Sequence, residues 1–174
     1  MRSRFCRDNC FTMVSGLLLG ASTLFVVIVC AVGGPLHASC TIEWSWDAKC
    51  SDVNNAIVKQ IALWKTDDNC KGGGEKCLYA LVSRTDRIIK ATHTTPKKGY
   101  VDDLTFTFTQ NSNICNVNGH STSETWYAVL DYSTNYCNLN NLITGAGLDK
   151  AKAYSETTSD RICTQYSSRN CDKY

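Results

Sequence analysis

Apolar residues after position 50 recur at the spacing of one helix face. The intervals are three and four residues, which is the period of an amphipathic helix. The residues on this face are Val53, Ile57, Val58, Ile61 and Trp64. Ser51 or Asp52 can cap the first turn, and the glycines at 72–74 cannot continue a helix. The pattern therefore predicts a helix over residues 52–65.

Most of the remaining chain alternates apolar with polar residues or is rich in β-branched residues, as strands are. The predicted strands cover residues 40–46, 76–84, 87–95, 101–110, 114–117 and 125–133. Segment 136–143 fits either a strand or a helical turn, and 147–154 fits a short helix. The 101–110 strand is the clearest, because Leu104, Phe106 and Phe108 share one face and threonines occupy the other.

One early helix followed by antiparallel strands can close in two ways. The first is an up-and-down barrel of lipocalin type with the helix outside it, a mainly β fold with an interior cavity. The second is an α+β fold in which the helix packs on a curved antiparallel meander, in the order found in cystatins. Five or six predicted strands are fewer than the eight of a lipocalin barrel, which favours the meander.

The first 38 residues have the character of a targeting segment. Arg2, Arg4 and Arg7 precede residues 11–34, which contain no charged side chain. This order is typical of a cleaved signal peptide, and the length also suits a type II single-pass membrane anchor. Under either interpretation, residues 39–174 form a single extracellular disulfide-rich domain, and a membrane is contacted only through residues 11–34 if they are retained.

Cysteine usage agrees with an oxidising compartment. Eight of the 11 cysteines follow the leader: Cys40, Cys50, Cys70, Cys77, Cys115, Cys137, Cys163 and Cys171. An even set of this density predicts disulfides, whose connectivity the sequence leaves open. No pair has the C-x-x-C spacing typical of thiolate metal sites, so no metal is expected.

The charge of the extracellular part excludes one class of partner. From Ser39 onward, 15 basic residues balance 15 acidic ones, because the leader carries the whole net charge of +2. A neutral body lacks the cationic surface that attracts a nucleic-acid backbone. No nucleic-acid partner is therefore expected.

Two histidines follow the leader, at His93 and His120. Either could act as a general acid or base in a small secreted hydrolase. No nucleophile signature accompanies them. We therefore expect a protein that is not an enzyme and that uses no cofactor, with the hydrolase kept as an alternative.

Two predicted strands begin with a carboxylate on an apolar face. Asp102 shares a face with Phe106 and Phe108, and Glu124 shares a face with Trp126. If both faces line one cavity, the acids lie at its rim and the aromatic rings inside it. A small organic cation suits such a site, because the carboxylate neutralises the ammonium and the ring faces attract it.

The passage from Cys115 to Cys137 resembles a known family. Cys115-Asn-Val117, Glu124-Thr-Trp126 and Cys137 are similar to the signature of the biogenic-amine-binding lipocalins of tick saliva. The resemblance implies a small disulfide-stapled lipocalin barrel that sequesters a host mediator such as histamine or serotonin. Within it, Glu124 would pair with the ammonium and Trp126 would pack on the ligand ring. Asp102, Phe106 and Phe108 join this site from strand alternation.

Two further functions stay open at this point. The same cavity could bind an apolar lipid mediator, for which the carboxylates would be irrelevant. A meander without a cavity would instead make the protein a secreted interaction module. Its partner would then contact the outer surface of the domain.

Overall fold

A computed structural model describes residues 35–125 and 128–174, which lie in one compact unit, Gly33–Tyr174. The predicted leader is outside the described residues except for positions 35–38. The main elements are β1 (Ser39–Asp47), α1 (Cys50–Leu63), β2 (Tyr79–Arg84), β3 (Ile88–Thr94), β4 (Val101–Asn111), β5 (Ile114–Ser123), α2 (Thr134–Gly145) and β6 (Ser155–Thr157). Short 3-10 helices lie at Asp68–Cys70, Leu148–Lys150 and Tyr166–Ser168.

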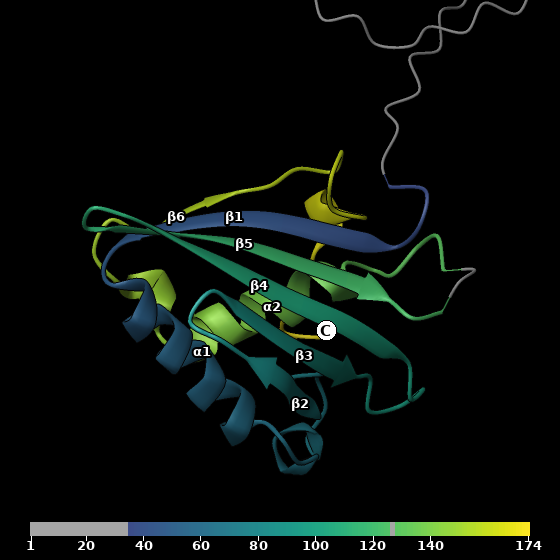
Figure 1. The fold of residues 1–174 in the computed structure, drawn as a ribbon. Helices are drawn as coiled ribbons and strands as arrows, with labels where there is room; N and C mark the ends of the chain where they lie inside the picture. Colours follow the sequence, from purple (N-terminus) through teal and green to yellow (C-terminus); the bar gives the residue numbers. More distant parts are fainter. Residues whose placement is uncertain (1–34, 126–127) are drawn as a thin grey trace, which may run out of the picture. The chain divides into compact units, whose positions relative to one another are not determined.

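The six strands form one open antiparallel sheet in the order β2-β3-β4-β5-β1-β6 (Figure 1). The first strand therefore lies inside the sheet, between β5 and β6. Because β2 is at the opposite edge, the connection from β1 to β2 crosses the sheet, and α1 lies in that connection. Both helices pack against β4 and β5 and against each other. The prediction of a mainly β antiparallel fold with an early helix is confirmed.

Alternation along the strands places the large apolar side chains on one face, which we call the inner face. It includes Trp44 and Trp46 of β1, Phe106 of β4 and Val117 of β5, all at most 2% exposed. The rings of Trp44 and Phe106 stack at 6.3 Å. Position 119 of β5 has to be glycine, because a Cβ there would lie 2.4 Å from the Trp44 ring.

The helices cover this inner face. α1 contributes Val53, Ile57 and Ile61, and α2 contributes Leu139, Leu142 and Ile143, all buried in one cluster with the strand residues. The opposite face of the sheet carries mainly Thr, Asn and Ser side chains that are exposed or half-buried. The core therefore lies between one face of the sheet and the two helices.

Most predicted elements are present. The helix at 52–65 is confirmed as α1, although it begins at Cys50, whose N–H donates to the Gln110 side chain at 2.6 Å. Neither Ser51 nor Asp52 therefore caps it, contrary to the prediction. The first four predicted strands are confirmed as β1 to β4, and the short strand at 114–117 extends to Ser123. Segment 136–143 belongs to α2, whereas 147–154 contains only a short 3-10 turn.

The predicted strand at 125–133 is wrong for the part that the structure describes, residues 125 and 128–133. Tyr132 and Ser133 have φ of 54° and 68°, which a strand does not allow. Asp131 instead accepts hydrogen bonds from the N–H groups of Ser133 and Asn135, both at 3.0 Å. These bonds satisfy free N–H groups at the start of α2. The end of this segment therefore caps α2 instead of continuing as a strand.

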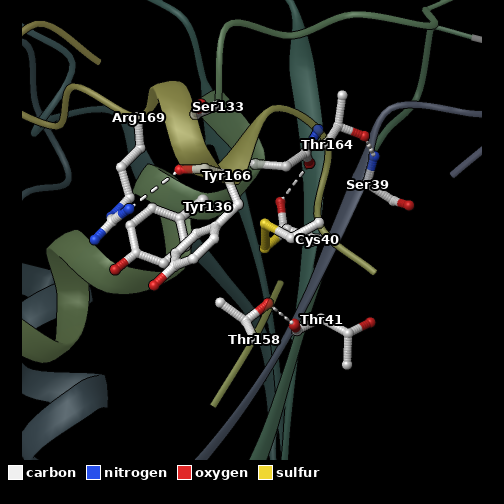
Figure 2. Close-up of a disulfide and its surroundings, with 12 residues drawn as sticks. Ser39, Cys40, Thr41, Ser133, Tyr136, Thr158, Thr164, Tyr166 and Arg169 are labelled. Atoms are coloured by element: carbon white, nitrogen blue, oxygen red, sulfur yellow. Dashed lines mark hydrogen bonds between the residues drawn. A yellow bond between two sulfur atoms is a disulfide. The ribbon is translucent and has the colours of Figure 1, made fainter. Parts of the chain in front are cut away.

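The eight predicted cysteines form four disulfides, as expected. The pairs are Cys40–Cys163, Cys50–Cys115, Cys70–Cys77 and Cys137–Cys171. Figure 2 shows the first of these, which joins β1 to the C-terminal segment. Backbone hydrogen bonds from Thr41 to Ile162 and from Thr164 to Ser39 flank it. Four disulfides support an extracellular, oxidising environment for these residues.

No helix within the described ranges is long and apolar enough to cross a membrane. The predicted anchor at residues 11–34 lies outside those ranges. Ala38, the last residue of the predicted leader, is buried, and its N–H donates to the Ala128 carbonyl at 2.8 Å. The ordered domain therefore includes residues just before the predicted boundary at position 39.

We expect the long-range disulfide to stabilise the domain more than the short-range one. Cys40 and Cys163 are separated by 123 residues, and Cys70 and Cys77 by 7. By chain-entropy arguments, the Cys40→Ala/Cys163→Ala variant should lose about 5 kcal/mol of unfolding free energy and Cys70→Ala/Cys77→Ala about 2 kcal/mol. Denaturant unfolding measures both, and an equal loss would contradict the expectation.

Candidate functional site

The structure describes four of the five predicted ligand residues. Asp102, Phe106 and Phe108 share the inner face of β4, as the alternation predicts, and all three are buried. Six residues of strand separate Asp102 from Phe108, or about 20 Å. Glu124 is exposed just beyond the end of β5, and Trp126 lies outside the described residues. Glu124 is nevertheless beside the start of β4, because its N–H donates to the Val101 carbonyl at 2.9 Å. The two carboxylates differ in exposure, since Asp102 is buried and Glu124 is not.

Asp102 is engaged with α2. The side-chain amide of Asn138 donates to its Oδ2 at 2.7 Å, and the Tyr79 hydroxyl donates to the Asn138 carbonyl at 3.0 Å. Burial raises the pKa of Asp102, and the hydrogen bond from Asn138 opposes that rise. This carboxyl group therefore holds α2 on the sheet, and a cationic ligand would have to compete with Asn138 for it.

His93 is completely buried beside the ring of Tyr79, at 4.6 Å between centroids. Its Nε2 lies 2.9 Å from the backbone carbonyl of Glu75. Burial lowers the pKa of His93 to about 4, so the ring is neutral at physiological pH. His120 is half-buried, with Nδ1 3.0 Å from the Thr41 hydroxyl, and burial lowers its pKa as well.

Glu156 of β6 receives four hydrogen bonds that the sequence did not predict. Trp44 Nε1 and the Tyr136 hydroxyl donate at 2.9 Å, the Tyr154 hydroxyl at 3.0 Å and Asn140 Nδ2 at 3.2 Å. Burial, followed by the charge of Glu156, raises the pKa of both tyrosines. The donors come from β1, α2 and the segment before β6. Three of the four bonds reach Oε2 and the bond from Tyr136 reaches Oε1, so this carboxylate joins the three elements.

An arginine lies on the outside of the same region. The Arg169 guanidinium is 4.2 Å from the centroid of the Tyr166 ring and 5.4 Å from that of Tyr136 (Figure 2). Together with Asn140 and Cys171, it lines a surface groove of about 530 Å³. The groove is next to the Cys137–Cys171 disulfide and is open to solvent.

A larger open groove of about 1140 Å³ lies at the end of the sheet where α1 begins. The β1–α1, β2–β3 and β4–β5 turns surround it, with Phe108 among its lining residues. Its charged side chains are Asp47, Lys49, Asp86 and Arg87, so both signs are present. Mixed charge does not select a cationic over an anionic ligand. Within the described ranges, no cluster of three His, Cys, Asp or Glu side chains can hold a metal ion.

The opposite end of the sheet carries exposed apolar side chains. Leu36 precedes β1, and Val129, Leu130 and Tyr132 lie in the segment before α2; we call these four residues the apolar end patch. The Ala38–Ala128 backbone hydrogen bond joins the two segments. Figure 1 shows that the start of β1 and the end of β5 lie at this same end. Sequence alternation missed the patch, because it assigned 125–133 to a half-buried strand.

Comparison with protein-family models and with curated proteins gave no significant match to the chain. The functional assignment therefore depends on the chain's own residues.

We expect His93 to make the stability of the domain dependent on pH. Its folded pKa of about 4 is below the ordinary value of 6.5, so the unfolded chain binds more protons between these values. The free energy of unfolding should keep its full contribution from His93 above pH 6.5 and fall by roughly 3 kcal/mol as the pH drops to 4. Asp102 and Glu75, whose pKa values burial raises, act in the opposite direction at the acid end. Denaturant unfolding across this range should show a weaker pH slope for His93→Gln, and identical slopes would contradict the expectation.

We expect Glu156 to contribute to stability rather than to ligand binding. Glu156→Ala leaves the hydroxyls of Tyr136 and Tyr154 and the indole N–H of Trp44 without their acceptor, which should cost roughly 3 kcal/mol. Glu124→Ala, at an exposed position, should change the unfolding free energy by less than about 0.5 kcal/mol. Thermal and denaturant unfolding measure both variants. Equal effects would show that the Glu156 network is not stabilising.

Proposed function

We propose that the protein is an extracellular, non-catalytic binding module that engages its partner through its outer surface. The observation that carries this proposal is the filled inner face of the sheet. Leu104 and Phe106 are at most 1% exposed there, and side chains from α1 and α2 pack over them. A small ligand between the sheet and the helices would have to displace close-packed side chains, which is costly.

Two further observations support the proposal. The four disulfides and the apolar leader both fit an extracellular protein. The completely buried histidine, His93, has a backbone carbonyl as the partner of its Nε2. A general base must instead reach a substrate or nucleophile. These features favour binding over a small hydrolase that uses His93.

A lipocalin barrel that sequesters histamine or serotonin is the second candidate. The resemblance of the passage from Cys115 to Cys137 to the amine-binding lipocalins supports it. The shared face of Asp102, Phe106 and Phe108 supports it too. It requires the chain to close around a cavity that Glu124 and Trp126 also reach. A lipid mediator would need the same closure. A surface-binding module needs none.

Calorimetric titration with histamine, serotonin and a long-chain fatty acid separates these candidates. The surface-binding module predicts no saturable heat with any of the three. Stoichiometric binding of an amine that is lost in Glu124→Gln and Asp102→Asn, but kept in the control Glu43→Gln, would establish the scavenger instead. Stoichiometric binding of the fatty acid would establish the lipid binder.

A further inference from the structure

We propose that the apolar end patch, Leu36, Val129, Leu130 and Tyr132, contacts the surface of a lipid bilayer. The inference rests on the proposed surface-binding function and names its partner. Four features of the molecule support it: the exposure of the patch, its construction, its aromatic and basic neighbours, and its place in the chain.

Among the described residues at this end of the domain, the patch contains the most exposed apolar side chains. Leu36 is 96% exposed, Leu130 66%, Tyr132 65% and Val129 58%. Water-facing aliphatic side chains that lie together mark interaction sites, whereas single ones are ordinary. Two aliphatic residues next to each other in a segment without regular structure can enter an interface without disturbing the sheet.

The backbone beneath the patch is held firmly. Ala38 donates to the Ala128 carbonyl at 2.8 Å, and the Ser123 N–H donates to the Ala38 carbonyl at 3.3 Å. The Gln165 side chain accepts from the Asp131 and Tyr132 N–H groups at 3.0 and 2.8 Å. The exposed side chains are therefore presented by an ordered support.

Aromatic and basic side chains lie beside the patch. Tyr132 stacks on Tyr174 at 6.1 Å, and Lys173 Nζ lies 4.8 Å from the centroid of the Tyr174 ring. In the adjacent turn between β3 and β4, Lys98 Nζ lies 5.8 Å from the centroid of the exposed Tyr100 ring. Tyrosine is enriched at membrane–water interfaces, and lysine ammonium groups favour lipid phosphates. The pair Tyr132–Tyr174 with Lys173 beside it suits the headgroup layer.

The position of the patch in the chain selects a bilayer over another protein. Residues 11–34 carry no charge, and this run ends two positions before Leu36. A segment of that length and character inserts in a membrane during secretion, and it stays there if it is not cleaved. In that case only Pro35 separates this run from Leu36 in the sequence, so the chain itself keeps Leu36 within reach of the bilayer.

Vesicle co-sedimentation tests this inference. The core and all four disulfides lie within residues 35–174, so this part can be secreted behind an unrelated cleavable signal. We expect it to sediment with phosphatidylcholine vesicles. Leu130→Gln should weaken the partition coefficient by about tenfold, because it removes one inserted leucine. The control Val82→Gln replaces a residue that is 63% exposed on β2 and should bind as the unchanged domain does.

Three results would overturn the inference. The first is a domain that stays in the supernatant with the phosphatidylcholine vesicles, and the second is an equal loss of binding in both variants. The third is self-association in analytical ultracentrifugation that Leu130→Gln abolishes while vesicle binding is absent, which would make the occupant a second copy. All three leave surface binding intact, whereas amine or fatty-acid binding in the calorimeter would overturn the proposed function itself. Unfolding curves check that both variants stay folded.

Discussion

Covering one face of an open sheet is the constraint on which the rest of this structure depends. Trp44, Trp46 and Phe106 lie on one side of the sheet, and burial of apolar surface such as theirs is the main driving force for folding a domain of this size. Because β2 and β6 are both edges, the sheet does not bury this face by closing on itself. The two helices perform this task, and the disulfides restrict the chain around them.

Polar groups inside the molecule follow from the same constraint. The chain that brings α2 onto the sheet also buries Asp102 and His93, which must find partners there because an unpaired buried polar group is costly. Asn138 donates to Asp102, and the Glu75 carbonyl pairs with Nε2 of His93. Glu156 of the edge strand β6 is also hydrogen-bonded, because it accepts from donors on β1 and α2. Asp102, one of the two carboxylates that suggest ligand binding in the sequence, thus joins α2 to the sheet, whereas the other, Glu124, is exposed.

Local patterns predicted the local structure well. The period of α1 and the alternation of β4 depend on neighbouring residues, so the sequence was sufficient for both. Long-range pairing was not accessible in this way: nothing in residues 39–47 indicates that β1 pairs with β5, or that Cys40 joins Cys163. The Glu156 network and the loop at 128–133 depend on this pairing and on the capping of α2. For the same reason, Asp102 could be placed on the correct face without its partner being known.

A crystal structure under xenon pressure tests the central claim most directly. Xenon enters apolar cavities that close-packed side chains leave empty, so it reports whether space exists between the sheet and the helices. The filled inner face predicts no xenon site among Trp44, Phe106 and Leu142. An ordered xenon atom there, on the face shared with Asp102, would reveal an interior cavity and contradict a module that binds only through its surface.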